Sequence, residues 1–172
     1  MPARRALSRT STRSHLSEGE LAAWRSYIST TRALTAALDL DLGEFGISLA
    51  DYELLDGLAK APQARMRMSD LAEIALVSRS RLSHRMKVLE DQGWVERARC
   101  SEDKRGLFAV LTPKGKKLVT KIAPHYAQSI KERMLESLSG SELATLEKIF
   151  SKVRSGISTE QLALCEKTST QK

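Results

Sequence analysis

The stretch that decides the fold spans residues 78–115 and reads SRSRLSHRMKVLEDQGWVERARCSEDKRGLFAVLTPKG. Its first part predicts a helix over residues 79–91, because the apolar side chains recur at i, i+4 and i+7 and so share one face, which we expect to be buried. These side chains are Leu82, Met86 and Leu89. Gly93 stands just beyond this helix and indicates where it ends.

A β-hairpin is predicted directly after this helix. Residues 94–100 and 107–111 are rich in residues that favour strands, and the stretch between them, residues 101–106, is polar, as expected of a hairpin tip. Thr112-Pro113 then stands where the N-cap and first turn of another helix are expected. The sequence thus predicts a helix, a hairpin and a helix in direct succession.

Further helices are predicted on both sides of this stretch. Ser17 followed by Glu20 has the spacing of a capping box, and Ser48 and Ser69 precede two more segments of helical periodicity as N-caps. The helix after the hairpin is interrupted at Ser139-Gly140 or Ser141, where a last helix begins. The predicted order is four helices, two strands and two helices.

Two short helices joined by a tight turn and followed by a hairpin form a winged helix-turn-helix, whose second helix enters the major groove of DNA. Here that second helix is residues 79–91, which we name the reading helix. The predicted fold class is mainly α with a small β-hairpin wing.

The distribution of charge points to the same part of the chain. The net charge of +7 is uneven: residues 60–133 carry 17 basic and eight acidic residues, whereas residues 17–59 carry two basic and eight acidic ones. A local basic surface attracts a polyanion even when the rest of the molecule is acidic. Charge alone leaves open that these side chains only solvate helix surfaces.

The reading helix favours nucleic acid more specifically, because it carries four cations and no acid before Glu90. A solvated surface helix would usually interleave acids with bases. We expect base contacts in the major groove from Ser80, Arg81, Ser83, His84 and Arg85. We expect phosphate contacts from Ser69, Ser78, Arg79, Lys87 and Lys104. For His84, a surface histidine without a role is an equally good interpretation.

The hairpin tip carries Asp103-Lys104-Arg105-Gly106. An arginine held out on a hairpin suits the narrow, electronegative minor groove, and Asp103 is placed to orient Arg105 by a charge-assisted hydrogen bond. Taken alone this is an ordinary charged turn. Its place between two strands favours the minor-groove role.

Other classes of function find little support in the sequence. There is no apolar run long enough to cross a membrane and no secretory signal pattern at the start. The two cysteines are 65 positions apart, which indicates a reducing cytoplasm and neither a disulfide framework nor a zinc site. No catalytic or phosphate-binding motif is present, so we expect no enzyme activity, no cofactor and no metal.

Five segments of the chain together form a recognisable pattern: Met68–Glu73, Ser80–Ser83, Leu89–Val95, Asp103–Arg105 and Leu111–Gly115. In these segments the sequence resembles the MarR family of bacterial transcriptional regulators. Members often carry Asp-Pro before the wing motif, where this chain has Cys100-Ser101, and peroxide-sensing members carry a cysteine in the first helix, where this chain has none.

The resemblance implies a domain organisation and partners. Residues 47–111 would form the winged helix-turn-helix, and residues 17–46 and 112–156 a helical region through which two copies form a homodimer. The composition of residues 1–16, with four arginines and no acid, favours a disordered basic arm, although it also fits an organellar transit peptide, and residues 157–172 are expected to be a C-terminal tail. The dimer would be a transcriptional repressor in the bacterial cytoplasm. It would bind the nucleoid at a pseudo-palindromic operator in double-stranded DNA.

Many relatives release DNA when a small aromatic acid or phenol binds. Trp24, Tyr27 and Tyr52 are candidates to line such a pocket here, although aromatic residues at helical spacing more often belong to a core. The alternative to a specific regulator is a winged-helix module for non-specific DNA, RNA or protein binding.

Overall fold

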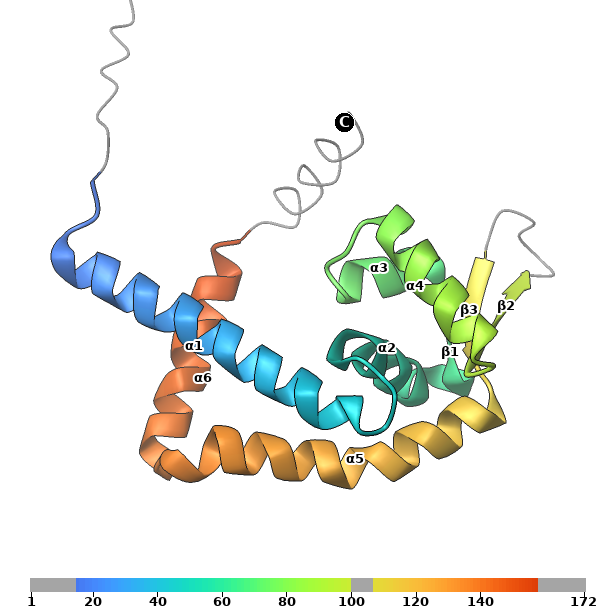
Figure 1. The fold of residues 1–172 in the computed structure, drawn as a ribbon. Helices are drawn as coiled ribbons and strands as arrows, with labels where there is room; N and C mark the ends of the chain where they lie inside the picture. The colour runs from blue at the N-terminus through green and yellow to red at the C-terminus, as the bar shows by residue number, and fades with distance from the viewer. Residues whose placement is uncertain (1–14, 100–106, 158–172) are drawn as a thin grey trace, which may run out of the picture. The chain divides into compact units, whose positions relative to one another are not determined.

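The computed structural model describes residues 15–99 and 107–157. The chain divides into two compact units, one ending at Ala33 and one beginning at Leu34, and the first helix runs through both. The elements, shown in Figure 1, are α1 (Glu18–Gly43), α2 (Leu49–Lys60), η1 (Pro62–Ala64), β1 (Arg65–Arg67), α3 (Met68–Ile74), α4 (Arg79–Asp91), β2 (Val95–Arg99), β3 (Leu107–Leu111), α5 (Pro113–Arg133), η2 (Leu135–Ser137) and α6 (Gly140–Ser155).

The predicted start of α1 is confirmed in the first unit. The Ser17 backbone N–H donates to Glu20 Oε2 at 2.8 Å, and the Glu20 N–H donates in return to Ser17 Oγ at 3.3 Å. This reciprocal pair satisfies two of the donors that a helix leaves unpaired at its N-terminus. The hydrogen bonds also lower the pKa of Glu20, because they favour its charged form.

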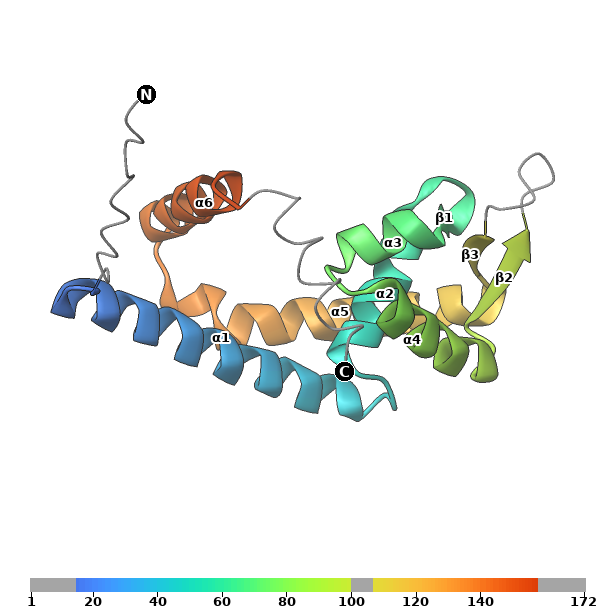
Figure 2. The ribbon, with the colours of Figure 1, turned by 90° about the horizontal axis from the view of Figure 1, so that it is seen from above.

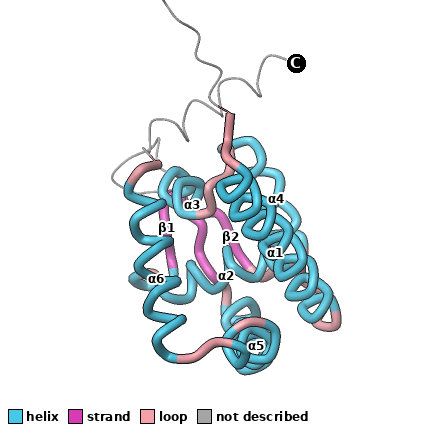
Figure 3. The backbone as a smooth tube through the Cα atoms, turned by 90° about the vertical axis from the view of Figure 1, so that its left-hand side faces the viewer, coloured by secondary structure: helices cyan, strands magenta, loops and turns pink. Residues whose placement is uncertain are grey.

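The second unit holds the hydrophobic core. Leucines of α2 meet the buried stripe of α4, the inner face of the sheet and one face of α5, and Leu55, Leu58, Leu89 and Ile122 have no exposed surface. Figure 1 shows α3, α4 and the strands gathered around α2, with α5 passing beneath it, and Figure 3 shows α5 nearly end-on in the same place. This core fixes α4 with its polar side outward.

The sheet has three antiparallel strands in the order β1-β3-β2, and the sequence had predicted only two. In the added strand, Arg65, Met66 and Arg67 pair with Val110, Ala109 and Phe108 of β3. Met66 is half-buried and packs against the core, while its two neighbours are exposed. Three residues are too few to display a period of two in the sequence.

The prediction that Ser69 caps α3 is wrong. The N-cap position is occupied by Arg67, without a side-chain cap, because β1 runs directly into the helix and places Ser69 inside its first turn. The Ser69 hydroxyl instead donates to Asp70 Oδ1 at 2.9 Å. Ser69 lines the same hollow as Arg79, the first residue of the reading helix.

The start of α5 fixes the hairpin to the helical scaffold. Thr112 caps α5 as predicted, with its Oγ1 accepting the Gly115 N–H at 3.0 Å, and its own N–H donates to the Trp94 carbonyl at 3.0 Å. Glycine is the only residue type that fits at position 115, because a Cβ there would lie 2.1 Å from the Trp94 oxygen. The wing is thus held at its base by backbone contact with α5.

The restart at Ser139 is also confirmed, as the Ser139 side chain and Glu142 form a capping box at the start of α6. Across the described residues we find no helix with the length and apolarity needed to cross a bilayer.

Candidate nucleic-acid interface

The reading helix is α4, and its start is fixed by Ser78. The Ser78 Oγ accepts the Arg81 N–H at 3.3 Å, which makes Ser78 the N-cap, and it lies 3.0 Å from the Ser80 Oγ. No acid occupies the first turn, so the positive end of the helix dipole adds to the charge of the basic side chains there. The N-terminus of α4 is therefore the more electropositive end.

The two faces of α4 differ completely in exposure. Leu82, Met86 and Leu89 are at most 1% exposed, as predicted. The exposed polar side chains are Arg79, Ser80, Arg81, Ser83, His84 and Lys87, with Asp91 at the last position of the helix. Figure 2 shows that β2 begins close to the end of α4. The structure therefore brings four of the five predicted base-contacting residues to one accessible surface.

Arg85 is the fifth of these residues, and its side chain contacts α2. Its Nη1 donates to Asp51 Oδ1 of α2 at 3.0 Å, and its side chain is only 38% exposed. Arg85 therefore connects the reading helix to the scaffold. The sequence does not reveal this partner, because Asp51 lies 34 positions away.

A second arginine connects the wing to α4. Arg97 of β2 donates from Nη2 to the Ser83 carbonyl at 3.0 Å, and its Nε lies 2.9 Å from Glu90 Oε2 in an ion pair. The Nε is buried and makes no hydrogen bond of good geometry, so the contact with Glu90 is electrostatic. Strand β2 and the reading helix are therefore joined by two contacts of a single side chain.

A hollow of about 330 Å³ lies where α3, α4 and β3 meet. Its polar lining comes from Arg67, Ser69, Arg79 and Ser83, two guanidinium groups and two hydroxyls that are all suited to donate to phosphate oxygens. Of these, Ser69 and Arg79 were predicted as phosphate ligands and Ser83 as a base contact. Arg67 was missed, because the strand that carries it was not predicted.

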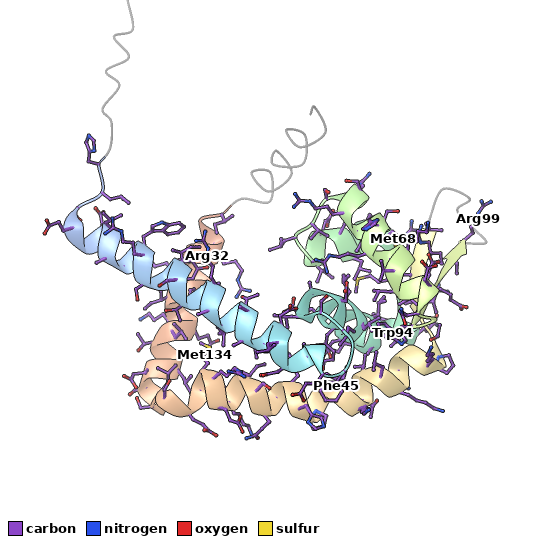
Figure 4. All side chains as sticks on the ribbon, in the orientation of Figure 1. Arg32, Phe45, Met68, Trp94, Arg99 and Met134 are labelled. Carbon is purple, nitrogen blue, oxygen red and sulfur yellow. The ribbon has the colours of Figure 1, made fainter. Side chains whose placement is uncertain are left out.

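The exposed side of the sheet carries a second arginine beside Arg67. The guanidinium carbons of Arg65 and Arg67 lie 4.9 and 5.3 Å from the centre of the Phe108 ring, which is the geometry of cation–π contact. Arg99 extends from the end of β2 (Figure 4) and is also exposed. The basic surface thus continues from α4 along the sheet to Arg99, at the end of β2 away from α5.

The predicted wing residues Asp103, Lys104 and Arg105 lie outside the described residues.

The three residues predicted to line an effector pocket differ in how exposed their side chains are. Trp24 and Tyr27 of the first unit are 54% and 46% exposed, with ring centroids 6.0 Å apart. Tyr52 is 2% exposed and packs edge-on against Tyr126 in the core of the second unit. Burial, with a smaller effect of the Asp56 charge, raises the pKa of Tyr52 to about 12.

A helix-turn-helix with a cationic reading helix, followed by a hairpin wing that belongs to a three-stranded sheet, defines a winged helix-turn-helix protein. Comparison with known proteins gives the family. The sequence model of the MarR family matches residues 45–106. The structure superposes with a TM-score of 0.80 on AbsC, a MarR family transcriptional regulator from Streptomyces coelicolor, at 38% identity over 83% of this chain and 97% of that one. The chain belongs to the MarR family of transcriptional regulators.

Two further comparisons agree. Sco3205, a MarR family transcriptional regulator from Streptomyces coelicolor solved in complex with DNA, is 36% identical over 84% of this chain and 91% of its own, with a TM-score of 0.82. The multiple antibiotic resistance protein MarR of Salmonella typhimurium is 29% identical over 84 residues, or 49% of this chain. The chain spans 58% of the length of this curated relative.

Proposed function

We propose that this protein is a dimeric transcriptional repressor that binds a pseudo-palindromic operator in double-stranded DNA through the reading helix of each protomer. The observation that carries the proposal is the exposed face of α4, where the cations and hydroxyls of Arg79 to Lys87 stand together, with Asp91 as an exposed acid only at the last residue, while the opposite face is anchored in the core. That a relative, Sco3205, was solved in complex with DNA supports the same function.

The individual contacts follow from the geometry of α4. Ser80 and His84 lie opposite the buried stripe, with Arg81 beside them, so these residues are directed at base edges. Arg79 lies with Ser69 in the hollow beside the wing and would contact phosphate. Lys87 and the wing residue Lys104 would add phosphate contacts, and Arg105, oriented by Asp103, would enter the minor groove.

A homodimer is part of this proposal because the last helix has a large unburied apolar surface. No residue of α6 is buried, although Ile149 and Val153 are apolar and 51% and 54% exposed. Leu40 of α1 is 75% exposed. Apolar surface of this extent on helices favours burial against a second copy. Two reading helices related by a two-fold axis would match half-sites about 34 Å apart.

Release of DNA by a small aromatic or phenolic effector, in a bacterial cytoplasm, completes the proposed function. Trp24 and Tyr27 have exposed ring surface for such a molecule, whereas Tyr52 is buried in the core of the second unit. An effector that favours a spacing of the two reading helices different from that of the operator would lower the affinity for DNA.

The experiment is fluorescence anisotropy of the pure protein on two duplexes across a salt series. One duplex comes from upstream of the protein's own gene and the other is its scrambled sequence. We expect a Kd of about 10⁻⁸ M or tighter for the first and a preference of about a thousandfold over the second. Equal and steeply salt-dependent binding to both would favour the non-specific alternative, and no binding at low salt would exclude a DNA function.

Two variants and a control test the reading helix itself. Arg81→Ala should reduce the preference for the cognate duplex by about tenfold, because it removes a base contact worth about 1–3 kcal/mol. Arg79→Ala should weaken binding to both duplexes alike and lower the salt slope by about 0.9. Lys131→Ala, an exposed cation in the last turn of α5, is the matched control and should leave both quantities unchanged.

A further inference from the structure

The carboxylate of Asp51 joins the reading helix to the scaffold. Asp51 lies in the first turn of α2, where its N–H donates to Ser48 Oγ at 3.1 Å and its Oδ2 accepts the Ser48 hydroxyl at 2.5 Å. Its other oxygen, Oδ1, accepts Arg85 Nη1 from α4 at 3.0 Å. One carboxylate therefore completes the cap of α2 and holds an arginine of the reading helix at the same time.

The N-terminus of α2 is also fixed to α1. Asp39 Oδ1 accepts the Leu49 N–H at 2.7 Å, so two carboxylates lie at the positive end of the α2 dipole. Asp51 is 20% exposed in its side chain, which limits the screening of its charge by water. The partner of Arg85, Asp51, is thus itself fixed in place by Ser48 and by the N-terminus of α2.

The position of Arg85 on α4 agrees with a scaffold role. At about 100° per residue, Arg85 lies about 70° from the middle of the buried stripe, whereas His84 lies about 170° from it. Arg85 is therefore at an edge of the polar face, and its hydrogen bond to Asp51 shows that this edge lies beside α2. A bond at this edge resists rotation of α4 about its own axis.

We propose that Arg85 is a positioning residue, whose ion pair with Asp51 fixes the rotation of the reading helix and thereby sets which base edges its neighbours reach. The inference rests on the proposed function of α4 and replaces the base contact that the sequence predicted for Arg85. A rotation of α4 moves Ser80, Arg81 and His84 relative to the groove. Loss of the pair should therefore lower the preference for the cognate sequence without removing a phosphate contact.

The test compares Arg85→Ala, Asp51→Asn and the double variant in the anisotropy assay. Asp51→Asn retains the size of the side chain and an acceptor for Ser48, and removes the charge that Arg85 needs. Each single variant should lower the preference for the cognate duplex by a similar factor, about three- to tenfold, and the double variant should be no worse than either. The salt slope should stay at the wild-type value in all three, and Arg85→Lys should recover part of the preference.

The contrary result is equally clear. If Arg85 contacts DNA, Arg85→Ala will lower the salt slope by about 0.9 or abolish one base preference, while Asp51→Asn will leave binding unchanged or strengthen it by freeing the arginine. Either outcome overturns the positioning role. It would leave the proposed function of the reading helix intact, because the wild-type protein would still prefer the cognate duplex.

A measurement without DNA separates the two proposals. Residual dipolar couplings of the α2 and α4 amides report the orientation of one helix relative to the other in the free protein. We expect Arg85→Ala and Asp51→Asn to change the α4 couplings in the same sense, with those of α2 retained. Unchanged α4 couplings in both variants would overturn the positioning role even if the wild-type protein failed to bind any duplex.

Discussion

Replacing Gly115 with alanine tests how the wing is attached to the scaffold. A Cβ at this position would lie 2.1 Å from the Trp94 carbonyl oxygen and 2.8 Å from Leu111 Cδ1. Real Cβ atoms essentially never approach closer than 3.0 Å, so the first turn of α5 must retreat by about 1 Å from Trp94. The carbonyl cannot simply rotate away, because it already accepts the Thr112 N–H at 3.0 Å and shares the Thr112 hydroxyl, 3.1 Å away, with the Gly93 carbonyl at 2.8 Å.

The cost follows from these contacts. A retreat of about 1 Å breaks the Thr112 N–H bond to the Trp94 oxygen and the bond of the shared Thr112 hydroxyl to the Gly93 and Trp94 carbonyls, at about 1 kcal/mol each, and disturbs the Thr112 cap for about 1 kcal/mol more. The better helix propensity of alanine returns about 1 kcal/mol. Gly115→Ala should therefore lower the free energy of unfolding by about 2 kcal/mol.

Urea denaturation followed by circular dichroism, at one fixed protein concentration, measures this loss. With a slope of about 2 kcal/mol/M, the midpoint should fall by about 1 M. Gly57→Ala in α2 is the matched control, because the new Cβ would have no atom within 4 Å, and it should raise stability by about 0.5–1 kcal/mol. A Gly115→Ala protein that unfolds at the wild-type midpoint would refute the close approach of α5 to Trp94.

Three further predictions concern other contacts. Ser78→Ala removes the cap of α4 and should cost about 1 kcal/mol in urea denaturation, while Ser78→Gly should cost only a few tenths; equal costs would contradict the cap. Arg97→Met should separate the wing from α4, seen as faster amide exchange in β2 with Glu90 left unpaired, and unchanged exchange would argue against this link. The hydrogen bonds from Arg133 hold the pKa of Asp41 below its ordinary value of 3.8. The Asp41–Arg133 pair therefore stabilises the folded state fully above about pH 3.8, and this stabilisation is lost as the pH falls through the lower pKa of the folded state. Asp41→Asn should consequently make acid unfolding less steep below about pH 4, and an unchanged acid profile would count against the pair.

The elements that the sequence predicted well are those whose signals are local. The caps Ser17, Ser48 and Thr112 each combine a hydroxyl with an apolar period just after it, and all three accept from the expected backbone N–H. The buried stripe of α4 was likewise visible, because a helix that packs on a core must repeat its apolar residues about every 3.6 positions.

The features that the sequence did not predict depend on contacts between distant residues. Strand β1 is defined by its pairing with Phe108 and its neighbours more than 40 positions later, and three residues carry no periodic signal of their own. The placement of Arg85 depends on Asp51 in another helix. The sequence therefore predicted that Arg85 lies on the polar side of α4, but it could not predict the ion pair with Asp51. Ser69 was assigned as a cap because the strand before it was not recognised.

The most direct test of the central claim, that two reading helices bind one face of duplex DNA, is hydroxyl-radical footprinting of the protein on DNA from upstream of its own gene. Two protected patches about 10 base pairs apart on one face of the duplex, both weakened together by Arg81→Ala, are the predicted result. Protection spread evenly along the fragment, unaffected by Arg81→Ala, would contradict the claim and would mean that the cationic face of α4 binds phosphates without recognising sequence.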